Sequence, residues 1–172
     1  KVVRRSRVRL RLVRASDGHV AWSSTETRRP GTFVKSLTRR LSDGEWRWIV
    51  SATDAKGRAS TMTRSFVTNS TLGYLTLSRS LLRPSRKRGH LGISFRQSRE
   101  ADVRITVRTV GGRVVRHLGS EQLGAGRHEL GWNVRNDAGR IVRDGRYLVR
   151  VHARNSIGPV ALTKPVRVRR RF

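Results

Sequence analysis

The feature that most constrains the fold of this chain is the strict alternation of apolar and polar residues in short segments. In residues 147–153 (YLVRVHA), Tyr147, Val149, Val151 and Ala153 fall on one face of an extended strand, and Arg150 and His152 fall on the other. Residues 8–13 (VRLRLV) alternate in the same way, with arginine between the aliphatic residues. A period of two with β-branched residues indicates a half-buried β-strand. No segment shows a sustained helical period, so the sequence predicts an all-β protein.

Turn signals separate the alternating segments. Asp-Gly occurs at 17–18, 43–44 and 144–145, and Gly-Gly occurs at 111–112. These dipeptides supply the positive φ that tight hairpins require. Short strands about 8–12 residues apart with such turns between them predict an antiparallel β-sandwich.

The strand pattern occurs twice in the chain. Residues 43–52 (DGEWRWIVSA) match residues 144–153 (DGRYLVRVHA) after a shift of 101 positions, and strands 8–12 and 103–107 match after a shift of 95. A repeat of about 100 residues is too long for a solenoid unit and suits tandem sandwich domains. We therefore predict two tandem β-sandwich domains, residues 1–70 and residues 71–172.

The aromatic residue that follows each of the two matched Asp-Gly turns is a predicted structural anchor. An aromatic ring that enters a strand just after a tight turn packs into the core while its polar atom reaches an upstream backbone group. Tyr147 has a hydroxyl for this role, and Trp46 has an indole N–H. We expect the cores to be anchored by Trp46, Trp48, Trp132 and Tyr147.

The two copies differ in what precedes them. In the second copy, residues 74–78 (YLTLS) and 91–95 (LGISF) read as the first two strands. With the shift of 95, the counterparts of these strands in the first copy fall before residue 1. Our hypothesis is that the first domain lacks its opening strands within this sequence, which would leave backbone donors exposed for strand pairing.

The second copy also resembles a known family. The motifs GRVV (112–115), AGRH (125–128) and DGRY (144–147) are similar to those of the immunoglobulin-like domain of the flagellar hook-capping (FlgD-type) proteins. The sequence departs from the family at 132–134 (WNV), where Trp-Asp-Gly is usual. The resemblance covers about residues 73–170. It implies immunoglobulin-like or fibronectin-III-like sandwiches, the first copy being similar in outline.

The charge of the chain indicates its class of partner. Lys and Arg number 39 against 11 Asp and Glu, which gives a net charge of +28 spread over both halves. Such a charge favours polyanionic partners. Arginine-rich codon usage is the alternative origin of the excess. The candidate partner contacts lie in three basic segments and are Arg7, Arg9, Arg11, Arg83, Arg86, Lys87, Arg88, Arg169, Arg170 and Arg171.

No motif in the sequence indicates catalysis. There is no nucleophile elbow, P-loop or dinucleotide fingerprint, and no cysteine. The five histidines lack metal-ligand spacing, and the acidic residues lie mostly in turns. We therefore expect no enzyme activity, no catalytic residue, no metal and no cofactor. No apolar run is long enough to span a membrane.

These patterns together predict a non-catalytic structural, assembly or adhesion module of a larger secreted or cell-surface bacterial protein. The expected partners are other domains or neighbouring subunits, and an anionic cell-wall polymer or glycan. One alternative is a wall-polymer or carbohydrate-binding module that tethers an upstream enzyme. A second is a subunit of an extracellular filament or flagellar-type assembly. Nucleic acid is less favoured, because the tryptophans that would stack on bases are expected in the cores.

Overall fold

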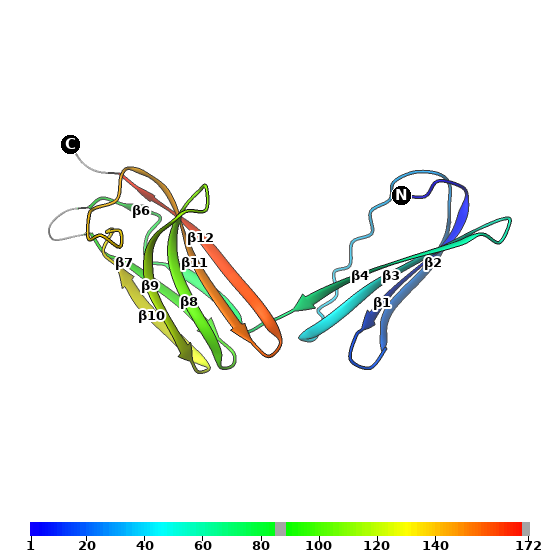
Figure 1. The fold of residues 1–172 in the computed structure, drawn as a ribbon, viewed down its shortest axis with the longest axis horizontal. Coiled ribbons are helices and arrows are strands. Elements are labelled where there is room, and N and C mark those ends of the chain that lie inside the picture. The colour runs from blue at the N-terminus through cyan, green and yellow to red at the C-terminus, as the bar shows by residue number, and fades with distance from the viewer. Residues whose placement is uncertain (85–88, 170–172) are drawn as a thin grey trace. The chain divides into compact units, whose positions relative to one another are not determined.

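The computed structural model of the chain describes residues 1–84 and 89–169. The chain divides into two compact units, Lys1–Thr68 (unit 1) and Asn69–Phe172 (unit 2). Both units are built of β-strands, which pair antiparallel except for one short parallel pair (Figure 1). The predicted all-β fold is thereby confirmed. Within the described ranges no helix has the length and hydropathy needed to cross a membrane.

Unit 1 is a single antiparallel sheet. Its strand order is β2-β1-β3-β4, and β1 pairs with both β2 and β3 along its length. All residues of unit 1 are described, and this is the one sheet that they form. The strands are β1 (Ser6–Arg14), β2 (Val20–Arg28), β3 (Gly44–Asp54) and β4 (Ala59–Thr68).

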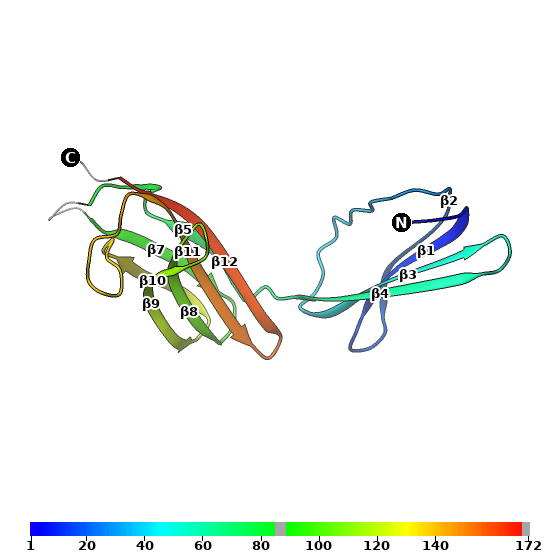
Figure 2. The same ribbon diagram turned by 45° about the horizontal axis from the view of Figure 1, so that its top comes forward.

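Unit 2 is a two-sheet sandwich. One sheet has the order β10-β7-β5 and the other the order β6-β12-β11-β8-β9, and they form separate layers (Figure 2). The two opening strands predicted at 74–78 and 91–95 are present as β5 and β7. The strands are β5 (Leu72–Leu77), β6 (Leu81–Leu82), β7 (Leu91–Gln97), β8 (Ala101–Thr109), β9 (Val114–Leu123), β10 (Gly126–Trp132), β11 (Gly145–Asn155) and β12 (Gly158–Val168).

The two units share the topology of one sheet. The order β2-β1-β3-β4 of unit 1 corresponds strand for strand to β9-β8-β11-β12 of unit 2. The residues that the repeat aligns, such as Val8 with Val103 and Val50 with Val151, lie on these corresponding strands. Within residues 1–68, unit 1 has no sheet that corresponds to β10-β7-β5. The first copy of the repeat therefore forms one of the two layers that the second copy forms.

The core of unit 2 lies between its sheets. On β7 the side chains of Leu91, Ile93 and Phe95 are buried while the residues between them face outward, as the period of two predicts. They meet Val149 and Val151 of β11, which are fully buried. Each such side chain contributes about 1.5–3 kcal/mol to stability relative to an exposed one. This layer of apolar residues is what holds the sandwich together.

The aromatic residues after the Asp-Gly turns make the same contact in both units. The indole Nε1–H of Trp46 donates a 2.9 Å hydrogen bond to the carbonyl oxygen of Ser42. The hydroxyl of Tyr147 donates a 2.7 Å hydrogen bond to the carbonyl oxygen of Arg143. Both side chains are buried, so each satisfies its polar atom while its ring fills the core.

The other two aromatic anchors make edge-to-face contacts. Trp132 lies against Tyr147 with 5.9 Å between ring centroids, and its Nε1–H donates to the carbonyl oxygen of Arg135. Trp48 lies on the inner face of β3, 5.8 Å from Trp22 of β2. Trp132 is fully buried, whereas Trp48 is partly exposed.

The departure from the FlgD-type motif falls on a strained backbone position. Val134 takes φ of 60° and is fully buried. It stands where the family usually has glycine, the residue that adopts positive φ without steric cost. The turn keeps its geometry, since the amide of Val142 donates to the carbonyl oxygen of Val134 at 3.0 Å. A valine therefore occupies a glycine conformation.

Candidate binding surfaces

The three arginines predicted on the first strand lie side by side on the outer face of β1. Arg7, Arg9 and Arg11 alternate with the inward residues, and Arg7 and Arg9 are exposed. Their cross-strand neighbours are mostly uncharged, as where Arg9 lies between Thr25 of β2 and Ser51 of β3. The face is therefore a positive strip without an acidic partner in register.

The structure brings two of the other predicted contacts together. Arg83 follows β6 and Arg169 follows β12, and these strands pair in parallel. The amide of Arg169 donates a 2.9 Å hydrogen bond to the carbonyl oxygen of Leu82, which places Arg169 beside Arg83 along the backbone. The remaining predicted contacts lie outside the described residues; they are Arg86, Lys87, Arg88, Arg170 and Arg171.

A larger basic cluster lies on the outer face of unit 2. It combines the outward residues of β8 and β11, which are neighbours in the five-stranded sheet. In register, His152 lies opposite Arg104, and Arg154 lies opposite Asp102. We call this set the arginine face: Arg104, Arg108, Arg146, Arg150, His152 and Arg154.

Electrostatics show that the charges of the arginine face act on one another. Burial and the positive charges of Arg150, Arg104, Arg154 and Arg108 hold the pKa of His152 below its usual 6.5. After burial, the contribution of these four arginines to the lowered pKa of His152 marks a local excess of positive charge. An anion placed over these guanidinium groups would relieve the repulsion and accept charge-assisted hydrogen bonds.

The arginines of this face are visible in the sequence, but the sequence does not show that they lie together. Arg150 and His152 are recognisable as outward residues from the alternation in β11. Nothing in the sequence places them beside Arg104, because that contact depends on the pairing of β8 with β11. The available signal in the sequence is that β8 and β11 both show the alternation and that each has a matched segment in the first copy.

The second surface is the uncovered inner face of the unit 1 sheet. A groove of about 970 Å³ runs along it, lined by aliphatic residues of β1 and β3 such as Val8, Leu10 and Val50. Met62 of β4, which also lines the groove, is 54% exposed. The corresponding face in unit 2 is the buried core of the sandwich.

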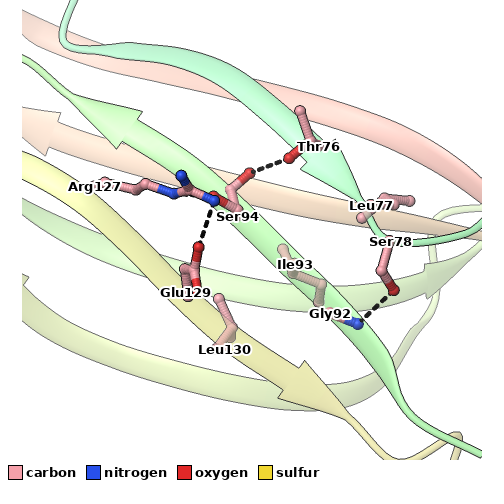
Figure 3. A pocket seen from close by; sticks show the side chains of 9 residues that line it. All are labelled: Thr76, Leu77, Ser78, Gly92, Ile93, Ser94, Arg127, Glu129 and Leu130. Carbon is pink, nitrogen blue, oxygen red and sulfur yellow. Dashed lines mark hydrogen bonds and ion pairs between the residues drawn. The ribbon is translucent and has the colours of Figure 1, made fainter.

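A third hollow, of about 480 Å³, lies on the outer face of the β10-β7-β5 sheet (Figure 3). Its polar groups bond to one another: Arg127 donates from Nε to Ser94 Oγ at 3.2 Å and pairs with Glu129 at 2.6 Å. Ser78 Oγ accepts the amide of Gly92. No histidine lines this hollow, and the carboxylate that does, Glu129, is paired with Arg127. These polar groups therefore already have partners within the sheet.

Within residues 1–84 and 89–169 no group of three or more His, Asp or Glu side chains converges as metal ligands do. Two of the carboxylates accept backbone amides instead. Asp54 accepts the amides of Lys56 and Arg58, and Asp137 accepts the amide of His117.

Comparison with known proteins agrees with the fold of unit 2. Residues 82–156 match the family described as FlgD Ig-like domain, so this part of unit 2 is similar to that family, as its motifs predict. No curated protein matches the chain.

Two solved structures are similar to this chain at low identity. The crystal structure of dimeric latent PorU from Porphyromonas gingivalis aligns over 99% of this chain and 16% of that one, at 14% identity and a TM-score of 0.42. The crystal structure of a tetra-tandem repeat in the extending region of a large adhesion protein aligns over 97% of this chain and 42% of that one, at 19% identity and a TM-score of 0.37. The chain thus spans less than half the length of either.

Proposed function

We propose that this chain is a non-catalytic structural or adhesion module of a larger secreted or cell-surface bacterial protein, and that unit 2 holds an anionic partner on its arginine face. The observation that carries the proposal is the arginine face itself. Guanidinium groups from two paired strands converge there, with Asp102 as the one acid in register with the face. A rigid sheet fixes their spacing, so an anion is bound without the cost of ordering a loop.

The chemistry of the face favours a phosphate- or carboxylate-bearing polymer. Arginine binds both groups through paired N–H donors. The outward positions of β8 and β11 carry no Trp, Tyr or Phe, so the face offers no ring for stacking on nucleobases or sugars. An anionic cell-wall polymer or acidic glycan therefore fits better than nucleic acid or a neutral carbohydrate.

A role as an assembly subunit is the second candidate, and a specific observation favours it. The unit 1 sheet has an uncovered apolar face, which is a surface that associates with other polypeptide. Such a face serves assembly, whereas the arginine face serves a soluble or surface-bound polyanion. The two roles concern different units and are compatible in one protein.

The proposal is tested by binding of linear polyphosphate to the full chain across a salt series, with neutral dextran as the negative probe. Two triple variants remove equal charge: Arg104→Gln/Arg150→Gln/Arg154→Gln on the arginine face and Arg7→Gln/Arg9→Gln/Arg11→Gln on β1. The first should weaken binding about tenfold or more and lower the salt slope by about two, because phosphate contacts release counterions. The second should weaken binding by about threefold or less through net charge alone.

Titration of His152 by NMR gives a second readout of the same binding. Polyphosphate at the arginine face should raise the pKa of His152, since it offsets the neighbouring positive charges. Equal losses in both triple variants, with no movement of the His152 titration, would show that binding is diffuse and that the arginine face is not a site.

A further inference from the structure

Unit 2 shows what covers the inner face of the corresponding sheet. There the face packs against β10-β7-β5, and the central strand β7 inserts Leu91, Ile93 and Phe95. In unit 1 the same face lines the groove, with Met62 54% exposed and Phe33 45% exposed at its side. The groove is thus a sandwich core that lacks its second layer.

The segment Gly31–Leu37 of unit 1 is the counterpart of β10. Both segments follow the edge strand of the shared sheet, β2 in unit 1 and β9 in unit 2, and both match at the shift of 95. Both begin with a glycine in the same unusual conformation, φ of 154° at Gly31 and 148° at Gly126. β10 pairs only with β7, whereas residues 32–37 form no strand. A strand without a partner loses its hydrogen-bond ladder, which explains the difference.

One hydrogen-bonded residue pair of the missing strand pairing is already formed. Val2 and Gly31 exchange two backbone hydrogen bonds, of 2.8 and 2.9 Å, in an isolated antiparallel bridge. In unit 2 the first register pair of β7 with β10 joins Gln97 to Gly126. The shift of 95 carries this pair onto Val2 and Gly31. Val2 thus sits where the last residue of a β7-like strand would end.

The side chains after Gly31 already alternate as in a strand. Phe33 lies under the guanidinium of Arg28, with 4.8 Å to the ring centroid. The Nζ of Lys35 lies 5.8 Å from the ring of Trp22. Val34 between them is 89% exposed. Phe33 and Lys35 therefore contact side chains of the sheet, whereas Val34, which also lines the groove, is largely exposed, so the segment is placed to pair with a strand.

We propose that the groove of unit 1 receives an extended peptide strand that enters in line with Lys1 and Val2, pairs antiparallel with Thr32–Leu37 and completes a sandwich. Its inward residues are apolar at every second position, as in β7. Tethering at Lys1 is favoured because the Val2–Gly31 bridge already holds the end of such a strand in register. This inference goes beyond the proposed function and is independent of the arginine face.

The charge of the groove lining determines which charged residues the incoming strand should carry. Its lining includes five basic residues and two acids, and the acids are already paired: Glu26 with Arg28 and Lys35, and Asp54 with Arg58. The lining thus has an excess of positive charge, and its field favours carboxylates over ammonium groups at the outward positions between the apolar residues of the incoming strand, without direct ion pairs. A second copy of unit 1 fits poorly, because its 16 basic and 5 acidic residues would set two positive faces together. The basic lining residues are Lys1, Arg4, Arg28, Lys35 and Arg58.

The test fuses the pentapeptide Leu-Glu-Ile-Glu-Phe directly before Lys1 of the full chain. Ser-Glu-Ser-Glu-Ser is the control with the same charge and length, and Leu-Lys-Ile-Lys-Phe tests the charge. Hydrogen-bonded residues alternate in antiparallel pairs, so the ladder begun at Gly31 continues at Phe33, Lys35 and Leu37. Their amides should exchange about tenfold slower or more in the first fusion than in the control, while Val34 and Ser36 change little. The lysine fusion should give less protection than the glutamate fusion.

Three results would overturn the inference. The first is equal exchange at Phe33, Lys35 and Leu37 in the apolar fusion and its serine control. The second is stronger protection in the lysine fusion than in the glutamate fusion. The third is protection of these amides in the unfused chain that disappears on dilution, with light scattering showing a dimer, since a second copy would then fill the groove. The polyphosphate readouts on the arginine face are unaffected by any of them.

Discussion

The hydroxyl of Tyr147 donates a 2.7 Å hydrogen bond to the main-chain carbonyl of Arg143, four residues earlier. Trp46 makes the same contact to Ser42, with an indole in place of the phenol. In each unit the bond ties the entry of a central strand to the turn before it. The repeat in the sequence is thus a repeat of one local device, built from a turn and an aromatic donor.

Removal of the Tyr147 hydroxyl tests the strength of this device. Tyr147→Phe keeps the ring and leaves the Arg143 carbonyl without this donor, so unit 2 should lose about 0.5–1.5 kcal/mol of unfolding free energy. Tyr74→Phe is the matched control, because Tyr74 is 79% exposed. Urea unfolding followed by residue-resolved NMR separates the units. An equal effect of both variants would contradict a structural role for the Tyr147 hydroxyl.

At Val134 we expect the usual order of stability of an alanine and a glycine variant to be reversed. At an ordinary buried position, Ala is more stable than Gly by about 0.5–1 kcal/mol. At Val134 the positive φ costs a non-glycine residue about 1–2 kcal/mol. Val134→Gly should therefore be at least as stable as Val134→Ala. Both should be less stable than the parent chain, since burial of a valine is worth about 1.5–3 kcal/mol. Thermal unfolding that places Val134→Ala clearly above Val134→Gly would show that this turn is not strained.

His152 predicts a pH dependence of unit 2 stability. Its pKa is lowered in the folded state, so the unfolded chain binds the proton more readily. Stability is therefore full above the usual pKa of 6.5 and falls as the pH drops through that value. His152→Gln should flatten the unfolding free energy of unit 2 between about pH 7 and pH 5. An unchanged slope in the variant would remove His152 as the titrating group.

Asp54 predicts an acid-sensitive contribution in unit 1. A side-chain hydrogen bond from Arg58, with the amides of Arg58 and Lys56, holds the pKa of Asp54 below its usual 3.8. Its stabilising effect is present above the unfolded pKa and is lost as the pH falls through the folded value. Asp54→Asn should unfold at a lower urea concentration at pH 7 and converge with the parent chain in strong acid. A constant difference at every pH would mean that the charge of Asp54 is irrelevant.

Local features of this chain are readable from its sequence. Alternation in residues 8–13 and 147–153 marks strands, because a sheet buries one face and side chains alternate across it. Asp17 shows turn chemistry by accepting the amide of His19 at 3.0 Å. The aromatic donors Trp46 and Tyr147 act over four residues. Each of these interactions joins neighbours in the chain, so the residue types alone specify it.

Contacts between segments that are far apart in the sequence could be identified only from the tertiary structure. Arg104 and His152 become neighbours only through the pairing of β8 with β11, and Arg83 approaches Arg169 only through the parallel pair of β6 with β12. Candidate sites predicted from runs of basic residues therefore missed the arginine face. Register between strands depends on the whole core, which a local pattern of charge does not report.

The sequence by itself determined the strands, the turns, the aromatic anchors and the similarity of the second half to FlgD-type domains. The tertiary structure decided which arginines share a face, and which β-like segment forms a strand. Residues 126–132 and 31–37 occupy matched positions, yet only the former is a strand, because it lies beside β7, whereas the latter has only the bridge from Gly31 to Val2. A β-strand is stabilised by hydrogen bonds to another segment, so its formation depends on a partner as well as on its own residues.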